Sequence, residues 1–254
     1  MSGREDTDAG PGAGAAGAVG TVQIAQTARD GYRPAPAGTH PSNDSPAYAS
    51  TKLRHPLHPP IEIPQTRSEQ TGPSHAAAHF GPLAHDLTRQ HGGAPIGERI
   101  VIHGRVMDDA GRPVPETLVE IWQANSAGRY AHPSDTHDAP LDPNFSGAGR
   151  TLTDADGRYQ FVTIRPGAYP WANHANAWRP AHVHFSLLGP CCLTRLVTQM
   201  YFPGDPLLDA DPIFNAVPDA RARERLIARF DLSATRPDWA LGFRFDLVLR
   251  GRCA

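Results

Sequence analysis

The sequence has few cysteines, no long apolar run and no excess of charge of either sign. The three Cys among its 254 residues are Cys191, Cys192 and Cys253, and no C-x-x-C motif occurs. Because adjacent cysteines rarely pair, we expect free thiols in a reducing compartment rather than a disulfide framework. The formal net charge of -2, without blocks of like charge, argues against binding to nucleic acid.

The sequence also lacks signals for a membrane or for export. No stretch approaches the roughly 20 apolar residues that a membrane-spanning helix requires. The N-terminus begins with a mixture of acidic and basic residues and continues with a Gly- and Ala-rich run, so it does not resemble a secretion signal. We therefore expect a cytoplasmic protein that is not bound to a membrane.

Composition divides the chain into three parts. Residues 1–30, rich in Gly, Ala and charged side chains, are predicted to be a disordered tail. Residues 31–75 contain nine Pro, which oppose both helices and central strands, so we expect an extended arm that lies over another surface, such as a neighbouring chain. Residues 76–254 are predicted to form one folded domain, which is long enough to bury a core.

The folded part has the pattern of an all-β protein. Short apolar or alternating segments, separated by turn sequences, predict strands over residues 99–107, 118–123, 159–164, 181–188, 195–201 and 241–249. In the last of these segments, the odd-numbered residues are apolar and would share one face. Residues 219–230 carry an apolar stripe at helical spacing and predict one short helix. Many short strands with one helix favour a β-sandwich with an extended Pro-rich N-terminal arm.

The segment WRPAHVHF at residues 178–185 gives the clearest indication of chemistry. Residues two apart in a strand point to the same side, so His182 and His184 can present two imidazoles to one point. Taken alone, this pattern fits either a metal site or two ordinary polar His on the face of a sheet.

Two tyrosines in predicted loops favour the metal interpretation. Tyr130 follows a turn at Gly128, and Tyr169 lies in the loop 166–171; each could instead be an ordinary core or rim aromatic. A phenolate is a hard anionic ligand, which favours Fe(III) over Zn(II) or Cu(I) for a site made of these tyrosines with His182 and His184. Binding of such an ion would lower both phenol pKa values far below about 10.

With these residues in view, the sequence resembles the non-haem intradiol ring-cleaving dioxygenases, and within them the β-subunit branch that acts on protocatechuate. The shared stretches are PIGER (95–99), GRPVP (111–115), VEIWQAN (119–125), GRY (128–130), LDPNF (141–145), GAYPW (167–171), WRPAHVHF (178–185), QMYFPGD (199–205) and RFD (244–246). The resemblance extends from about residue 31 to the C-terminus. It departs mildly at Ala168, where the family commonly has Pro.

The resemblance implies a β-sandwich with one Fe(III) per catalytic subunit. The implied metal ligands are Tyr130, Tyr169, His182 and His184. Tyr169 is also an implied catalytic residue, because it would leave the metal when substrate binds. The other implied active-site residues are Arg179, Gln199, Trp171 and Ile213. Arg179 would stabilise negative charge on the ring, Gln199 would lie near the O2 site, and Tyr48 would contact a carboxylate of the substrate.

The resemblance also implies a reaction and a partner. The reaction is the Fe(III)- and O2-dependent opening of protocatechuate (3,4-dihydroxybenzoate) to 3-carboxy-cis,cis-muconate, in aromatic catabolism through the β-ketoadipate pathway. The partner is a homologous α subunit that lacks the iron ligands, in a higher hetero-oligomer that the arm at 31–75 would help to assemble.

Two alternatives stay open. One is the same chemistry on catechol, hydroxyquinol or a sulfonated catechol, although the catechol enzymes carry a helical N-terminal region that the Pro-rich arm does not match. The other is a non-catalytic β-sandwich module, either a transthyretin-like binding domain or the family's own α subunit. Such a module should not keep both tyrosines and both histidines of the predicted metal site.

Overall fold

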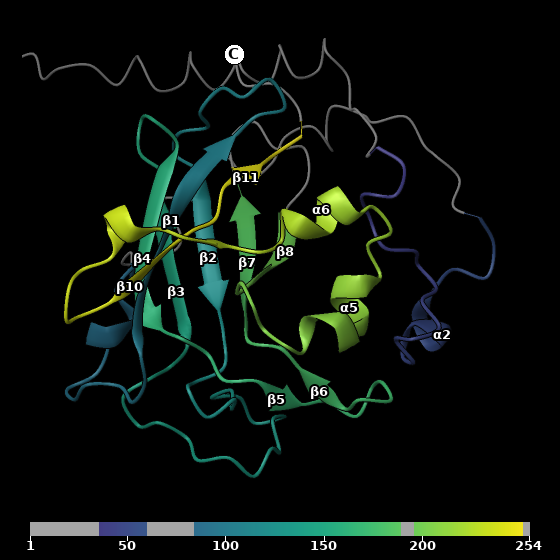
Figure 1. Ribbon diagram of the computed structural model, residues 1–254, viewed down its shortest axis with the longest axis horizontal. Coiled ribbons are helices and arrows are strands. Elements are labelled where there is room, and N and C mark those ends of the chain that lie inside the picture. The colour runs from purple at the N-terminus through teal and green to yellow at the C-terminus, as the bar shows by residue number, and fades with distance from the viewer. Residues whose placement is uncertain (1–35, 60–83, 189–195, 251–254) are drawn as a thin grey trace, which may run out of the picture.

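Two β-sheets packed face to face form the body of the protein, with short helices along one side (Figure 1). The computed structural model describes residues 36–59, 84–188 and 196–250. The predictions for residues 1–30, for the two ends of the arm and for the three cysteines lie outside these residues. Within the described part of the chain, no helix is long and apolar enough to cross a bilayer.

The first sheet is organised around β1 (Arg99–Met107), whose bounds match the predicted strand. On one side β1 pairs antiparallel with β4 (Arg158–Ile164). On its other side it pairs parallel with β10 (Leu241–Arg244) and β11 (Leu247–Val248). The two-residue strand β9 (Arg229–Phe230) adds to β10.

The second sheet has the order β3-β2-β7-β8, with all neighbours antiparallel. Its strands are β2 (Leu118–Trp122), β3 (Ala148–Leu152), β7 (His182–Leu188) and β8 (Leu196–Tyr201). A separate two-stranded ladder joins β5 (Tyr169–Pro170) to β6 (Trp178–Arg179). Figure 1 shows this ladder beneath the end of the second sheet at which β7 begins.

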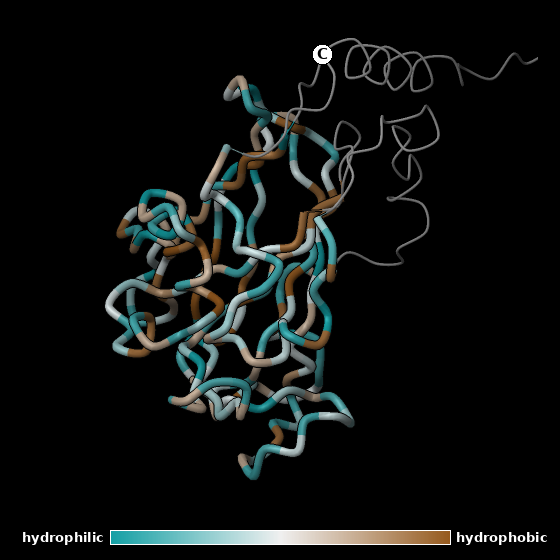
Figure 2. The backbone as a smooth tube through the Cα atoms, turned by 90° about the vertical axis from the view of Figure 1, so that its right-hand side faces the viewer, coloured by the Kyte–Doolittle hydropathy of each residue, from teal (hydrophilic) through white to brown (hydrophobic). Residues whose placement is uncertain are grey.

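The hydrophobic core lies between the two sheets, and it determines which way β7 faces. Val183, Phe185 and Leu187 are buried in the main cluster, together with apolar residues of β1 and β4 from the opposite sheet. Since side chains alternate along a strand, His182 and His184 point to the other face of the sheet. Figure 2 shows the apolar segments within the body and more hydrophilic colouring in the loops at its lower end.

The strand predicted over residues 241–249 is divided where it passes Gly104. The Phe245 carbonyl accepts a hydrogen bond from the Tyr159 hydroxyl, and the N–H of Arg105 donates to the Asp246 carboxylate at 3.0 Å instead of to a backbone carbonyl. The regular ladder therefore ends at β10 and resumes at β11. The odd-numbered apolar residues from 243 to 249 are all buried, so the predicted alternation is confirmed.

The helix predicted over residues 219–230 is shorter in the structure. Helix α6 covers Ala220–Glu224 and is capped by Asp219. Beyond it the backbone bonds to the end of β8: the N–H of Tyr201 donates to the Leu226 carbonyl, and the N–H of Ala228 donates to the Tyr201 carbonyl, both at 2.8 Å. Sheet-edge hydrogen bonds thus replace the last helical turns.

The described part of the chain has two further short α-helices, besides the 3-10 turns Leu87–Arg89, Leu208–Ala210 and Leu232–Ala234. One is α5 (Pro212–Asn215), and the other is α2 (Thr51–Arg54), a single turn within the arm. Backbone hydrogen bonds hold the arm against its own chain: the N–H of Asp219 donates to the Gly38 carbonyl at 2.9 Å, and the N–H of Ala49 donates to the Asn173 carbonyl at 3.1 Å. Apart from α2, residues 36–59 are irregular, as their Pro content predicts.

The close approach at Gly104 gives a test of the fold. A Cβ at Gly104 would lie 2.0 Å from the Phe245 carbonyl oxygen, so Gly104→Ala should lower the free energy of unfolding by about 1–3 kcal/mol. Gly92→Ala is the matched control, since no atom lies within 4 Å of its added Cβ, and it should cost less than about 0.5 kcal/mol. Urea denaturation compares the two variants, and equal stability would contradict this packing.

Candidate metal centre

The two histidines of β7 lie side by side on the face of the sheet that points away from the core. Their ring centroids are 4.8 Å apart, and His182 is 2% exposed. Nδ1 of His182 donates to the Pro180 carbonyl at 2.7 Å, which leaves its Nε2 as the atom with a free lone pair. The His184 ring stacks on Trp122 of β2, with centroids 4.7 Å apart and an interplanar angle of 3°.

Two tyrosines direct their hydroxyls at these imidazoles. Oη of Tyr130 lies 3.2 Å from Nε2 of His184, and Oη of Tyr169 lies 3.3 Å from Nε2 of His182. The loop of Tyr130 can approach that of Tyr169 because Gly128 has no side chain: a Cβ there would lie 2.1 Å from the Ala168 carbonyl oxygen. The structure thus brings together all four predicted metal ligands.

The donor geometry fits a single metal ion. Two ligand atoms that are each about 2.1 Å from one ion lie about 3.0–3.4 Å apart, which matches both phenol–imidazole separations. The four donors are two phenols and two imidazoles. No group of three or more His, Cys, Asp and Glu side chains that could hold a metal is found among the described residues. The tyrosines are therefore essential to any metal site here.

Burial sets the protonation of His182, His184 and Tyr130 when no metal is bound. Desolvation, with the nearby charge of Arg179, lowers the pKa of His182 well below its usual value and that of His184 to about 4. Desolvation, followed by interaction with Tyr169, raises the pKa of Tyr130. At neutral pH the imidazoles are neutral and ready to bind a metal, whereas the Tyr130 phenol needs a neighbouring cation in order to ionise.

Arg179 is a buried cation beside the four donors and forms a bidentate ion pair with the carboxylate of Asp211. Its Nε lies 3.1 Å from Oδ1 of Asp211, and its Nη2 lies 2.8 Å from Oδ2. Nη2 is also 2.8 Å from Oε1 of Gln199 and 3.0 Å from Oη of Tyr201. Its Nη1 faces the metal donors, 3.3 Å from Nε2 of His182.

Asp211 and Tyr201 were not singled out from the sequence. Asp211 precedes Pro212, a pairing typical of a helix start, and this signal could have placed it at the N-terminus of α5. It could not have placed the carboxylate under Arg179, which is 32 residues away. Tyr201 stands opposite His182 in the register of β7 and β8, and that relation needs the strand pairing.

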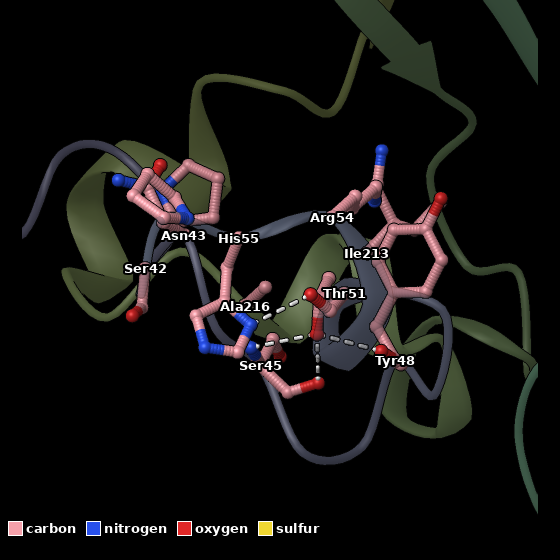
Figure 3. A pocket seen from close by; sticks show the side chains of 11 residues that line it. Ser42, Asn43, Ser45, Tyr48, Thr51, Arg54, His55, Ile213 and Ala216 are labelled. Atoms are coloured by element: carbon pink, nitrogen blue, oxygen red, sulfur yellow. Dashed lines mark hydrogen bonds between the residues drawn. The ribbon is translucent and has the colours of Figure 1, made fainter. Parts of the chain in front are cut away.

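The predicted substrate residues Trp171, Tyr48 and Ile213 lie between Arg179 and the arm, to which Tyr48 itself belongs. Trp171 lies under Arg179, whose Cζ is 5.5 Å from the ring, and it meets Tyr48 edge-on at a centroid distance of 4.9 Å. Tyr48 and Ile213 line a cavity of about 270 Å³ between the arm and α5 (Figure 3). None of the four metal donors lines this cavity, but Trp171 contacts both Arg179 and Tyr48, and Tyr48 does line it.

Most of the chain is similar in sequence to proteins of one family. Residues 70–251 match the family model described as Dioxygenase, and residues 32–66 match the model for the N-terminal part of the protocatechuate 3,4-dioxygenase β subunit. The protocatechuate 3,4-dioxygenase β chain of Burkholderia cepacia is 59% identical over 218 residues, which are 85% of this chain and 92% of that one. This chain belongs to the intradiol dioxygenase family.

Other members of the intradiol dioxygenase family are more distant. The hydroxyquinol 1,2-dioxygenase of Rhizobium sp. is 31% identical over 66% of this chain and 56% of its own length. The solved structure of 3-chlorocatechol 1,2-dioxygenase from Rhodococcus opacus 1CP superposes with a TM-score of 0.52 at 25% identity, covering 66% of this chain and 65% of that one. The resemblance and the β-sandwich inferred from the sequence are thereby confirmed.

Two features of the family bear on cofactor and assembly. Intradiol dioxygenases use iron. Protocatechuate 3,4-dioxygenase has an α chain as a separate relative: that of Pseudomonas putida is 30% identical over 76% of this chain and 95% of its own length.

The predicted metal site can be tested by removing one ligand. His182→Ala should reduce iron retention by well over about tenfold, because even groups that only support a ligand are worth about that much. His103→Ala is the matched control, since His103 is also a strand histidine but is bonded to Asp231 at 2.9 Å, away from the four donors. Iron content is measured after purification from iron-supplemented cells. Equal iron content in both variants would contradict the site.

Proposed function

We propose that this chain is the catalytic subunit of an enzyme that opens protocatechuate between its two hydroxyl-bearing carbons, with O2 as the second substrate and Fe(III) as the cofactor. The observation that carries the proposal is the convergence of two phenol oxygens and two imidazole nitrogens at 3.2 and 3.3 Å. The sequence relation to a protocatechuate 3,4-dioxygenase β chain supports the choice of substrate. Fe(III), when bound, supplies the electron-withdrawing centre that activates a catechol ring towards O2.

The two tyrosines have different proposed roles. Tyr130 is held in place, because its N–H donates to the Asp135 carboxylate at 2.8 Å. Tyr169 lies on β5, a two-residue strand outside the two main sheets. We assign Tyr169 as the phenolate that gives up its position to the substrate and accepts one of its two hydroxyl protons. His182 and His184 stay in place throughout, since their strand is fixed on both sides by β2 and β8.

Arg179 and Gln199 complete the proposed reaction site. The Nη1 edge of Arg179 points at the metal donors, where its charge can stabilise negative charge that develops on the ring. Gln199 uses its Oε1 to accept from Arg179 and from Tyr201, both at 2.8 Å. Its amide nitrogen, 3.5 Å from Nδ1 of His184, is therefore the part that is available near the proposed O2 site. Trp171 and Ile213 would hold the ring between them.

The proposed partner is a homologous α subunit that lacks the iron ligands, in a higher hetero-oligomer. The existence of separate α and β chains among the relatives supports this assembly. The arm also exposes large apolar side chains, with Leu53 and Leu57 exposed at 92% and 87%. We assign these two leucines of the arm to the surface that the partner chain would cover.

The same ring opening on another catechol is the second candidate, and Tyr48 separates the two. The Tyr48 phenol, which lines the cavity and contacts Trp171, would donate to the substrate's carboxylate, and one such bond to a charged group is worth about 1.5–3 kcal/mol. Tyr48→Phe should therefore lower kcat/KM for protocatechuate by about ten- to hundredfold, and should leave the value for catechol nearly unchanged.

Steady-state assays of both substrates on both proteins check the role of Tyr48. An equal loss for the two substrates would show that Tyr48 only packs against Trp171. The overall function is checked separately, by anaerobic addition of protocatechuate to the iron-loaded protein followed by O2. A shift of the visible tyrosinate band and then a muconate product are expected, and a colourless iron-loaded protein would contradict the proposal.

A further inference from the structure

The carboxylate of Asp211 is 0% exposed and is paired with a guanidinium that is only 3% exposed. Placing two charges away from water costs several kcal/mol per ion, and apolar residues of similar volume are often as stabilising or better. A pair of this kind therefore has to be explained by something other than stability. Its place next to the four metal donors indicates what that is.

The geometry of the pair fixes the direction of the guanidinium. Arg179 is planar, and Asp211 binds the edge formed by Nε and Nη2. Because the group is planar, holding that edge also fixes the direction of Nη1 on the opposite side of the guanidinium. Within the described residues, the contact recorded for Nη1 is Nε2 of His182 at 3.3 Å. Asp211 thus directs Nη1 of Arg179 towards the metal donors.

Tyr201 holds the same guanidinium from β8. Its hydroxyl lies 3.0 Å from Nη2 of Arg179, 3.0 Å from Oδ2 of Asp211 and 2.8 Å from Oε1 of Gln199. The hydroxyl can accept from the arginine and donate to one of the two oxygens. The Tyr201 hydroxyl therefore links the Arg179–Asp211 pair to Gln199. It also restricts rotation of the guanidinium about the long axis of the Arg179 side chain.

Asp211 also connects this cluster to the substrate cavity. Its Oδ1 accepts from the N–H of Ile213 at 3.4 Å, and its carbonyl accepts from the N–H of Asn215 at 3.0 Å, so it begins α5. Ile213 lines the cavity beneath Tyr48. One carboxylate therefore sets both the direction of the cation and the position of the helix that carries a wall of the cavity.

We propose that Asp211 and Tyr201 are positioning residues that act on ring opening through Arg179. Neither is assigned a contact with the substrate or the metal. The inference rests on the proposed function, because it concerns the charge that Arg179 contributes to that reaction. It predicts that the two residues matter for turnover only while the guanidinium is present.

A double-mutant cycle on the full-length, iron-loaded protein tests the proposal. Asp211→Asn keeps the size of the side chain and one acceptor oxygen but removes the negative charge that holds the guanidinium of Arg179. It should lower kcat for protocatechuate by about ten- to hundredfold, because a misplacement of about 1 Å in a catalytic group costs that much. Arg179→Gln should lower kcat at least as far. In the Arg179→Gln background, adding Asp211→Asn should change kcat less than about twofold.

Measurements other than activity separate positioning from a structural role. In Asp211→Asn the iron content, the visible band and the dissociation constant for protocatechuate without O2 should stay within about threefold of the wild-type values, with the loss confined to kcat. Asp231→Asn is the matched control, since this acidic residue is bonded to His103 at 2.9 Å and lies outside the cluster. Its kcat should equal that of the wild type.

Tyr201→Phe keeps the test open if Asp211→Asn does not fold. This variant leaves the buried ion pair intact and should lower kcat by about three- to tenfold, the effect of one hydrogen bond, again only when Arg179 is present. Losses that multiply in the double variants, or iron loss in the single ones, overturn the positioning role. A wild-type protein that opens no catechol overturns the proposed function and this inference with it, whereas multiplying losses in an active protein overturn the inference alone.

Discussion

One face of strand β7 packs into the core and its other face carries the two histidines of the candidate site. This constraint determines which side chains surround the site. Val183, Phe185 and Leu187 fill the core between the sheets, so the alternation of the strand leaves no other face for the two histidines. The pairing that holds β7 in its sheet also supplies the next neighbours of the site. Trp122 stands opposite His184 on one side, and Gln199 and Tyr201 stand opposite the two histidines on the other. A shift of one residue in either pairing would separate these side chains.

The other half of the site comes from a layer of loops outside the sandwich. Tyr130, the β5–β6 ladder and α5 approach the outer face of β7 from different parts of the chain. Close backbone contacts hold this layer, such as the one permitted by Gly128. The arm is attached to it through Asn173, whose side-chain oxygen accepts from the N–H of Ser50 at 2.8 Å. The sheet therefore fixes the two imidazoles, and the loops carry the two phenols and the residues proposed to contact the substrate.

The strands with strong alternation, and β7 above all, could be predicted from the sequence. Strand β3 was not predicted, because its segment AGRTL has no apolar face and Gly149 lies against Leu87, where a Cβ would come within 2.5 Å of that side chain. The four proposed metal ligands could be singled out from residue type and spacing together with the family resemblance. Asp211 could not, since a lone acidic residue before a proline shows only a helix start, and its contact with Arg179 exists only after the loops have folded onto the sheet.

The net charge of the site explains why Arg179, the cation proposed to act in the reaction, is paired with the carboxylate of Asp211. In the metal-free protein the two imidazoles are neutral, the Tyr130 phenol keeps its proton, and Arg179 is balanced by Asp211. Ionisation of both phenols would offset two of the three charges of a ferric ion, leaving one positive charge to attract an anionic diol. Without Asp211 the buried site would carry two, at a much larger desolvation cost. On the proposed mechanism Arg179 acts through its local positive charge, directed at the metal donors through Nη1, while Asp211 keeps the net charge of the buried site low.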